Sequence, residues 1–262
     1  MPFVFKWRPG RADPSPASVE VSERDGVRTL HLGSDSVQSA MRLADPWALE
    51  LEYTRCMMGF LLFPPEPRDV LMIGLGGGSL AKFIHRHLPA TRTVAMEINP
   101  QAAAAARSLF FLPPDDERLR VEIAEGSAFV ARHPESADVL LVDGYDGRTL
   151  APELAREAFF ADAAAALRGN GILVVNLWSS DSHFNRYAGW MEAHFPGGVL
   201  FLPAQRKGNI VVLAFLTPQG QPRWESLEKR AAELQARLGL EFPAFVEMLR
   251  RHNAGNKKRL LI

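Results

Sequence analysis

The chain has 262 residues, 47% of them apolar and 23% charged, which is enough for one sizeable core. Lys+Arg and Asp+Glu both number 30, so no net charge would attract nucleic acid or an anionic membrane. The single cysteine, Cys56, excludes an intrachain disulfide and fits a reducing compartment. With no apolar stretch of membrane-spanning length and no signal-peptide core, we expect a cytoplasmic protein without nucleic-acid or membrane partners.

Residues 1–45 are predicted to form an arm and a small antiparallel β unit. Three prolines among small polar residues favour an irregular course up to about residue 18. Period-two alternation in residues 19–22 and 27–32, on either side of Asp25-Gly26, predicts a hairpin, and residues 36–41 would add a strand. A unit this small should pack on the main domain or on a second subunit.

Residues 46–262 are predicted to form the main, nucleoside-binding domain. Asp45 as N-cap and Pro46 at the first position predict a helix over residues 47–63, which Pro64-Pro65 would end. Strands and helices then alternate, which implies a parallel sheet covered by helices on both faces. The predicted strands are residues 70–73, 93–98, 120–124, 138–142 and 171–177, and the predicted helices are residues 80–88, 100–110, 127–133, 152–167 and 182–195.

Two further strands, residues 199–202 and 210–215, are joined too closely for a crossover and must be an antiparallel pair. Helices are predicted at residues 224–238 and 242–251. The fold class is therefore α/β, with a mostly parallel seven-stranded sheet that ends in an antiparallel hairpin. This Rossmann-like arrangement is typical of S-adenosylmethionine-dependent transferases, and a plain dinucleotide fold lacks the hairpin.

A glycine turn follows the first strand of the main domain and leads into a helix at Ser79. A dinucleotide fingerprint would need a third glycine where Ser79 stands. The alternative spacing Gly-x-Gly-x-Gly is complete at Gly74, Gly76 and Gly78, with Gly77 between them, and is common in S-adenosylmethionine sites. Four glycines at the end of a buried strand indicate close backbone approach to a ligand.

Acidic residues stand at the end of the next strand and directly after the two strands that follow it, at the edge of the sheet where ligands bind. Glu97, followed by Ile98, could take both ribose hydroxyls, or it could be a surface glutamate. Glu125, followed by Gly126, could face an adenine amino group or only solvent. Asp143 and Asp146 flank Gly144-Tyr145 and could hold an ammonium group or take its proton; alternatively they only cap the strand and make the turn. The seven histidines show no metal-site spacing, so we expect no metal.

Together these motifs resemble the spermidine synthase (polyamine aminopropyltransferase) family over about residues 27–216. The resemblance rests on Val-Leu-Met-Ile-Gly-Leu-Gly-Gly-Gly, Ala-Met-Glu-Ile-Asn, Val-Glu-Ile-Ala-Glu-Gly, Leu-Val-Asp-Gly-Tyr-Asp-Gly and Gly-Ile-Leu-Val-Val-Asn. Gln38 stands where the family's Asp-Gly-x-x-Gln motif places its glutamine, near the nucleoside. The family's small β unit also implies a homodimer or a larger assembly.

The resemblance implies a role for each acidic residue. Glu97 would bind the ribose and Glu125 the adenine. Asp143 would be the general acid/base that readies the attacking amine, and Asp146 would help to hold the polyamine cation. The co-substrate would be decarboxylated S-adenosylmethionine or S-adenosylmethionine itself, and the acceptor a small-molecule amine. Tyr145 in the same loop is a candidate substrate residue.

The chain departs from the family at three places. Gly77 replaces the aspartate of Gly-Gly-Gly-Asp-Gly-Gly, which holds the free amine of the donor. The family's Tyr-His-Glu is missing, and Glu50 and Tyr53 are the nearby candidates for substrate contact. Ser34-Asp35 replaces the Asp-Gly of the glutamine motif. We therefore expect an aminopropyltransferase, with a methyltransferase on the same scaffold as the alternative and a non-catalytic nucleoside-binding protein as the third possibility.

Overall fold

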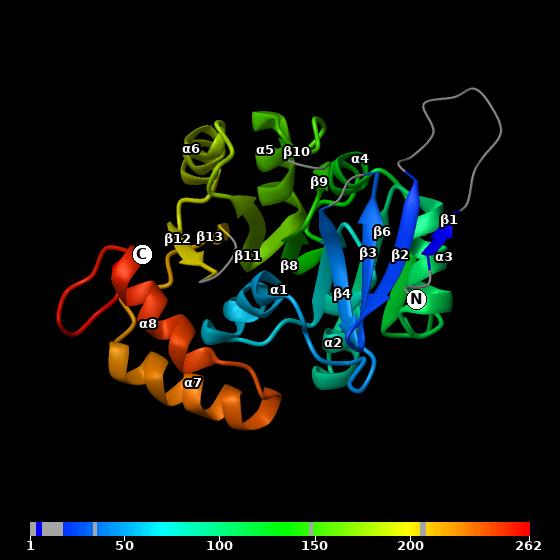
Figure 1. The fold of residues 1–262 in the computed structure, drawn as a ribbon. Helices are drawn as coiled ribbons and strands as arrows, with labels where there is room; N and C mark the ends of the chain where they lie inside the picture. Colours follow the sequence, from blue (N-terminus) through cyan, green and yellow to red (C-terminus); the bar gives the residue numbers. More distant parts are fainter. Residues whose placement is uncertain (1–3, 7–17, 34–35, 147–148, 205–207) are drawn as a thin grey trace.

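The structure is a computed structural model that describes residues 4–6, 18–33, 36–146, 149–204 and 208–262. A seven-stranded sheet lies at its centre and a four-stranded sheet lies beside it (Figure 1). The short strands β9 (Tyr145–Asp146) and β10 (Thr149–Leu150) form a separate antiparallel pair. No helix in the described ranges is long and apolar enough to cross a membrane.

The central sheet has the strand order β12-β13-β11-β8-β5-β6-β7 and confirms the predicted fold class. Its parallel strands are β5 (Asp69–Ile73), β6 (Arg92–Glu97), β7 (Leu119–Ile123), β8 (Ala137–Val142) and β11 (Leu167–Trp178). The hairpin of β12 (Val199–Pro203) and β13 (Asn209–Phe215) is antiparallel to β11. Because β6 and β8 lie on opposite sides of β5, a crevice for a ligand opens at the carboxyl ends of these strands.

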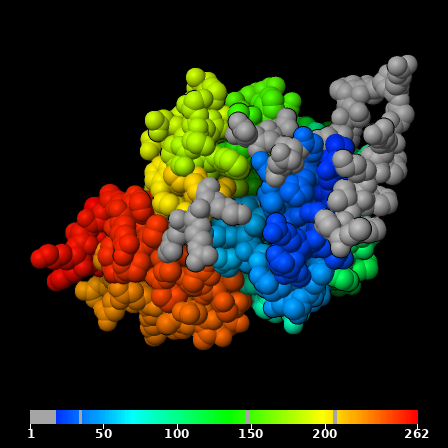
Figure 2. Space-filling view, viewed as in Figure 1, coloured from blue at the N-terminus to red at the C-terminus, as the bar shows by residue number. Residues whose placement is uncertain are grey.

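Helices cover both faces of this sheet, and each face has its own apolar core. One core includes α1 (Glu52–Met57), the 3-10 helix η1 (Met58–Leu62), α2 (Ser79–His87), α3 (Pro100–Leu109), α7 (Trp224–Leu238) and α8 (Phe242–His252). The other includes α4 (Gly126–Ala131), α5 (Glu157–Ala166) and α6 (Phe184–His194). In Figure 2 the small sheet and the C-terminal helices lie at opposite ends of the face that is shown.

The small sheet has the order β1 (Val4–Lys6), β2 (Val19–Arg24), β3 (Val27–Leu32) and β4 (Val37–Arg42). The predicted hairpin is confirmed, with φ of 52° at Asp25 and 72° at Gly26. The predicted irregular course is wrong for β1, which pairs antiparallel with β2. Leu30 and Met41 bury this sheet against Phe110, which follows α3. The predicted domain boundary at residue 45 stays a prediction.

The predicted helix over residues 47–63 is wrong in its first part. Helix α1 begins only at Glu52 and tightens into η1 after Met57. The carbonyl of Pro46 accepts a bond from Lys82 Nζ (2.8 Å), and the carbonyls of residues 49 and 50 accept bonds from Arg55 Nη1 (3.0 Å each). Because side chains take these carbonyls, the helical bonding pattern does not form there.

The predicted helix over residues 152–167 also starts too early. Residues 152–154 form a turn, residues 155 and 156 are bends, and α5 begins at Glu157. The N–H of Ala151 bonds the carbonyl of Gly144 (2.9 Å), which holds this segment against the loop after β8. The segment therefore borders the sheet edge where the acidic residues lie.

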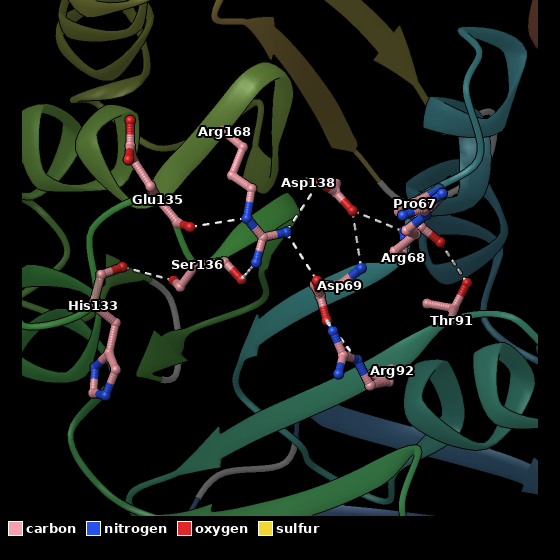
Figure 3. A network of polar contacts seen from close by, with 10 residues as sticks. All are labelled: Pro67, Arg68, Asp69, Thr91, Arg92, His133, Glu135, Ser136, Asp138 and Arg168. Atoms are coloured by element: carbon pink, nitrogen blue, oxygen red, sulfur yellow. Dashed lines mark hydrogen bonds and ion pairs between the residues drawn. The ribbon is translucent and has the colours of Figure 1, made fainter.

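An ion-pair network ties the amino-terminal ends of the parallel strands (Figure 3). Arg168 donates to Asp69 (2.8 Å) and Asp138 (3.2 Å), and Arg92 donates to the other oxygen of Asp69 (2.8 Å). Burial raises the pKa of Asp138, but bonds from the backbone of Asp69 and Arg68 and from Arg168 lower it below its usual value. The network lies at the edge of the sheet opposite the crevice, so we infer that it stabilises the fold.

Candidate active site

The turn after β5 brings bare backbone against the loop after β8. Gly74 has a φ of +86°, and a Cβ on it would lie 2.1 Å from the carbonyl oxygen of Asp143. The two segments are also joined by the N–H of Asp143, which bonds the carbonyl of Ile73 (2.9 Å). A side chain at position 74 would force them apart, which is the physical reason for glycine here.

Gly77 faces the small sheet. Its N–H donates to Ser39 Oγ (2.8 Å), and a Cβ on it would lie 2.8 Å from Phe110 Cδ1. Phe110 is fully buried, and Lys82 Nζ holds its carbonyl at 2.6 Å. An acidic side chain at position 77 would therefore require Phe110 to move.

Glu97, at the end of β6, holds the glycine turn in place. Its Oε2 accepts the N–H groups of Leu75 (3.0 Å) and Gly76 (3.3 Å), and its Oε1 accepts that of Asn99 (2.9 Å). An ionised carboxylate has about four lone-pair sites, so Glu97 can still accept hydrogen bonds from a ligand. Ile98, 64% exposed, lies beside it.

Glu125 caps α4. Its two carboxylate oxygens accept the N–H groups of Ser127 and Ala128 (2.8 Å each), and the Ser127 hydroxyl donates to it at 2.9 Å. An N-terminal carboxylate of this kind stabilises the helix. A role toward adenine stays a prediction.

Asp143 sits at the centre of a chain of hydrogen bonds. Tyr53 donates to its Oδ2 and Asn176 Nδ2 to its Oδ1, both at 2.9 Å, and Asn209 Nδ2 donates to Asn176 Oδ1 at 3.0 Å. Burial raises the pKa of Asp143, and the bonds from Asn176 and Tyr53 oppose that rise. Sequence reasoning missed both asparagines as site residues. For Asn176 the available signal was its position as the polar residue that ends the apolar run Gly-Ile-Leu-Val-Val-Asn.

Two cavities, of about 390 Å³ and about 260 Å³, meet at Asp143. Both are lined by Gln38, Asp143 and Tyr145, so the two cavities adjoin one another. The larger also contains six further predicted residues: Gly74, Gly76, Glu97, Ile98, Glu125 and Gly126. The smaller contains Tyr53 together with Asn176, Trp178 and Asn209.

The structure does not bring every predicted residue to this site. Gly77, Gly78 and Ser79 are outside both linings, although Gly78 caps α2. Glu50 is also outside, because Arg42 holds its carboxylate (2.6 Å and 3.1 Å). The side chain of Asp146 and the Ser34-Asp35 pair lie outside the described residues.

The lining is acidic. Four carboxylates border the two cavities, those of Glu97, Glu125, Asp143 and Glu153. No lysine, arginine or histidine is among the described residues of either lining. Such a site favours a cationic ligand over an anionic one. In the described part of the chain, no group of three His, Cys, Asp or Glu could hold a metal ion, and the absence of a metal stays a prediction.

Comparison with known proteins gives three matches of note. The family described as "Spermine/spermidine synthase domain" matches residues 50–186. A protein named polyamine aminopropyltransferase, from Chromobacterium violaceum, is 43% identical over 261 residues, covering 100% of this chain and 99% of that one. A probable spermidine synthase from Corynebacterium glutamicum has a TM-score of 0.69 at 17% identity, covering 94% and 96% of the two chains.

A methyltransferase also shares the fold. Human methyltransferase-like protein 13, solved in complex with SAH, has a TM-score of 0.62 at 22% identity. The match covers 79% of this chain and 96% of the human one. At this level of identity, the likeness extends to the fold alone.

Proposed function

The chain belongs to the spermine/spermidine synthase family, and on that premise we propose that it transfers an aminopropyl group. The donor is decarboxylated S-adenosylmethionine, the acceptor is a diamine or polyamine, and methylthioadenosine is released. The full-length relative named polyamine aminopropyltransferase supports this activity.

The charge of the site is the observation that carries the proposal. The donor bears a sulfonium and an ammonium, and the acceptor is an amine, so every charge on the two substrates is positive. Four carboxylates and no basic side chain border the described lining. Ordinary S-adenosylmethionine would add a carboxylate for which this lining offers no cation.

We assign the nucleoside to the larger cavity and the amine to the smaller one. Glu97 has acceptor sites left for the ribose hydroxyls. The sulfonium would then lie near Asp143, where the cavities meet. The neutral amine attacks the carbon beside the sulfur, a C–N bond forms, and the C–S bond breaks with its electron pair going to sulfur. Asp143 takes the proton of the amine, and a raised pKa makes it a stronger base.

Product formation tests this proposal. Purified protein, decarboxylated S-adenosylmethionine and a series of diamines should release methylthioadenosine, and the Asp143→Asn variant should release far less. Absence of methylthioadenosine with 1,4-diaminobutane, 1,5-diaminopentane and spermidine would reject aminopropyl transfer.

Methyl transfer from S-adenosylmethionine is the second candidate, and Gly77 favours it. The buried ring of Phe110 fills the space where the family's aspartate would project, so this turn lacks a carboxylate for the donor's free amine. Calorimetric titration separates the two candidates: methyl transfer predicts tighter binding of S-adenosylmethionine than of its decarboxylated form, and the acidic lining predicts the reverse.

We also propose a homodimer and a cytoplasmic location. The small β unit, which resembles that of the family, supports the homodimer. Light scattering of the protein as it elutes from a size-exclusion column measures its mass directly, and a monomeric mass would reject the dimer. Cell fractionation tests the location.

A further inference from the structure

Two buried amides extend from Asp143 along the smaller cavity. Asn176 and Asn209 are 3% and 5% exposed, and they are diagonal neighbours on the antiparallel strands β11 and β13, where Asn209 lies opposite Trp178. Asn176 donates to Asp143, and Asn209 donates to Asn176. An ionised carboxylate can only accept hydrogen bonds, so Asp143 fixes the direction of both amides. Asn209 must therefore turn its carbonyl Oδ1 away from Asn176.

This carbonyl oxygen is a ready acceptor. Asn209 lines the smaller cavity, and no group among the described residues donates to its Oδ1. An amide oxygen carries two lone pairs, so Asn209 Oδ1 can accept a hydrogen bond from a ligand N–H in the cavity.

The cavity between Asp143 and Asn209 suits a short methylene chain. Val37, Leu51 and Trp178 contribute apolar surface to its lining. The two hydrogen bonds and the two amide groups place Asp143 Oδ1 and Asn209 Oδ1 no more than about 10 Å apart. A short diamine can span that separation with a hydrogen bond at each end.

We propose that Asn209 is a specificity-determining residue that accepts a hydrogen bond from the distal nitrogen of the acceptor amine. This inference rests on the proposed function, because the near nitrogen is the one that reacts beside Asp143. An amide carbonyl selects a second N–H donor without a second negative charge, and Asp143 is the one acid in the described lining of this cavity. Asn209 thus distinguishes a diamine from a monoamine of the same length.

Binding of a matched pair of amines tests the proposal. 1,4-Diaminobutane and n-butylamine are titrated into the full chain saturated with methylthioadenosine. The unmodified chain should bind the diamine roughly ten- to a hundredfold more tightly, the range expected for one hydrogen bond to a charged group. Asn209→Leu should bind both amines about equally. Asn170→Leu, which changes an exposed asparagine bonded to Thr217, should keep the preference.

The ratio of the two affinities separates this role from a structural one. If Asn209 only supports Asn176 and Asp143, Asn209→Leu weakens the binding of both amines by the same factor, and the proposal is overturned. Should the leucine variant fail to fold, Asn209→Ala is titrated in the same way and is judged by the same ratio. A preserved diamine preference without release of methylthioadenosine from decarboxylated S-adenosylmethionine would reject the proposed function and would still support Asn209 as the residue that binds the second nitrogen of a diamine.

Discussion

Replacing Tyr53 by phenylalanine tests the protonation chemistry of Asp143. The Tyr53 hydroxyl donates to Asp143 Oδ2 at 2.9 Å, and this bond favours the ionised carboxylate. Burial beside Asp143 raises the pKa of Tyr53 well above its usual value, so the hydroxyl stays a donor. A hydrogen bond to a charged group contributes about 1.5 kcal/mol. Because about 1.4 kcal/mol corresponds to one pKa unit, its loss should raise the pKa of Asp143 by about one unit.

The pH profile of the reaction reports this change. Asp143 must be ionised to take the amine proton, so activity falls as the pH drops through its pKa. The kcat/KM of Tyr53→Phe is measured at each pH from the rate of methylthioadenosine release. The acidic limb of this profile should lie about one pH unit higher than that of the unmodified chain. Tyr187→Phe is the control, since Tyr187 is buried in the core on the other face of the sheet. An acidic limb that stays in place, or that moves to lower pH, would refute the reasoning.

Three further changes have defined outcomes. Asp143→Asn should lower turnover by about 10²–10⁴-fold while methylthioadenosine still binds, as measured by steady-state kinetics and calorimetry. Gly74→Ala should destabilise the fold by at least about 1–3 kcal/mol, measured by urea unfolding, because its Cβ would meet the carbonyl of Asp143. Arg168→Met should cost about 1 kcal/mol, since Arg168 is 41% exposed and its ion pairs with Asp69 and Asp138 are partly screened. The lowered pKa of Asp138 stabilises the fold above the unfolded-state value of about 3.9, and this contribution is lost as the pH falls through the folded-state pKa. The stability of Arg168→Met should therefore depend less on acidic pH than that of the unmodified chain.

Matched controls accompany these variants. Gly189→Ala should be neutral or slightly stabilising, because no atom lies within 4 Å of the added Cβ and the residue is in α6. A loss of stability in Gly189→Ala equal to that in Gly74→Ala would contradict the steric argument. An Arg168→Met variant as stable as the unmodified chain would show that the network in Figure 3 does not stabilise the fold.

Local sequence patterns predicted most of the elements. The helix at residues 224–238 matches α7 residue for residue, and the central strands match within one or two residues, apart from the early start of β11 at Leu167. Periodicity and turn residues determine such elements, because each one buries an apolar face formed from its own residues. The predictions failed at β1, which pairs with β2, and at residues 47–51 and 152–156, where side-chain bonds and turns replace the helical pattern.

The sequence by itself determined the fold class, the glycine turn, and the position of Glu97 and Asp143 at the carboxyl ends of their strands. All of these follow from short-range order. Only the tertiary structure decided which polar groups remain available to a ligand. Arg42 holds the carboxylate of Glu50, which lies outside both cavities. Asn209 lies 33 residues from Asn176 in the chain, and only the antiparallel pairing of β11 and β13 places its amide next to that of Asn176, which in turn bonds Asp143.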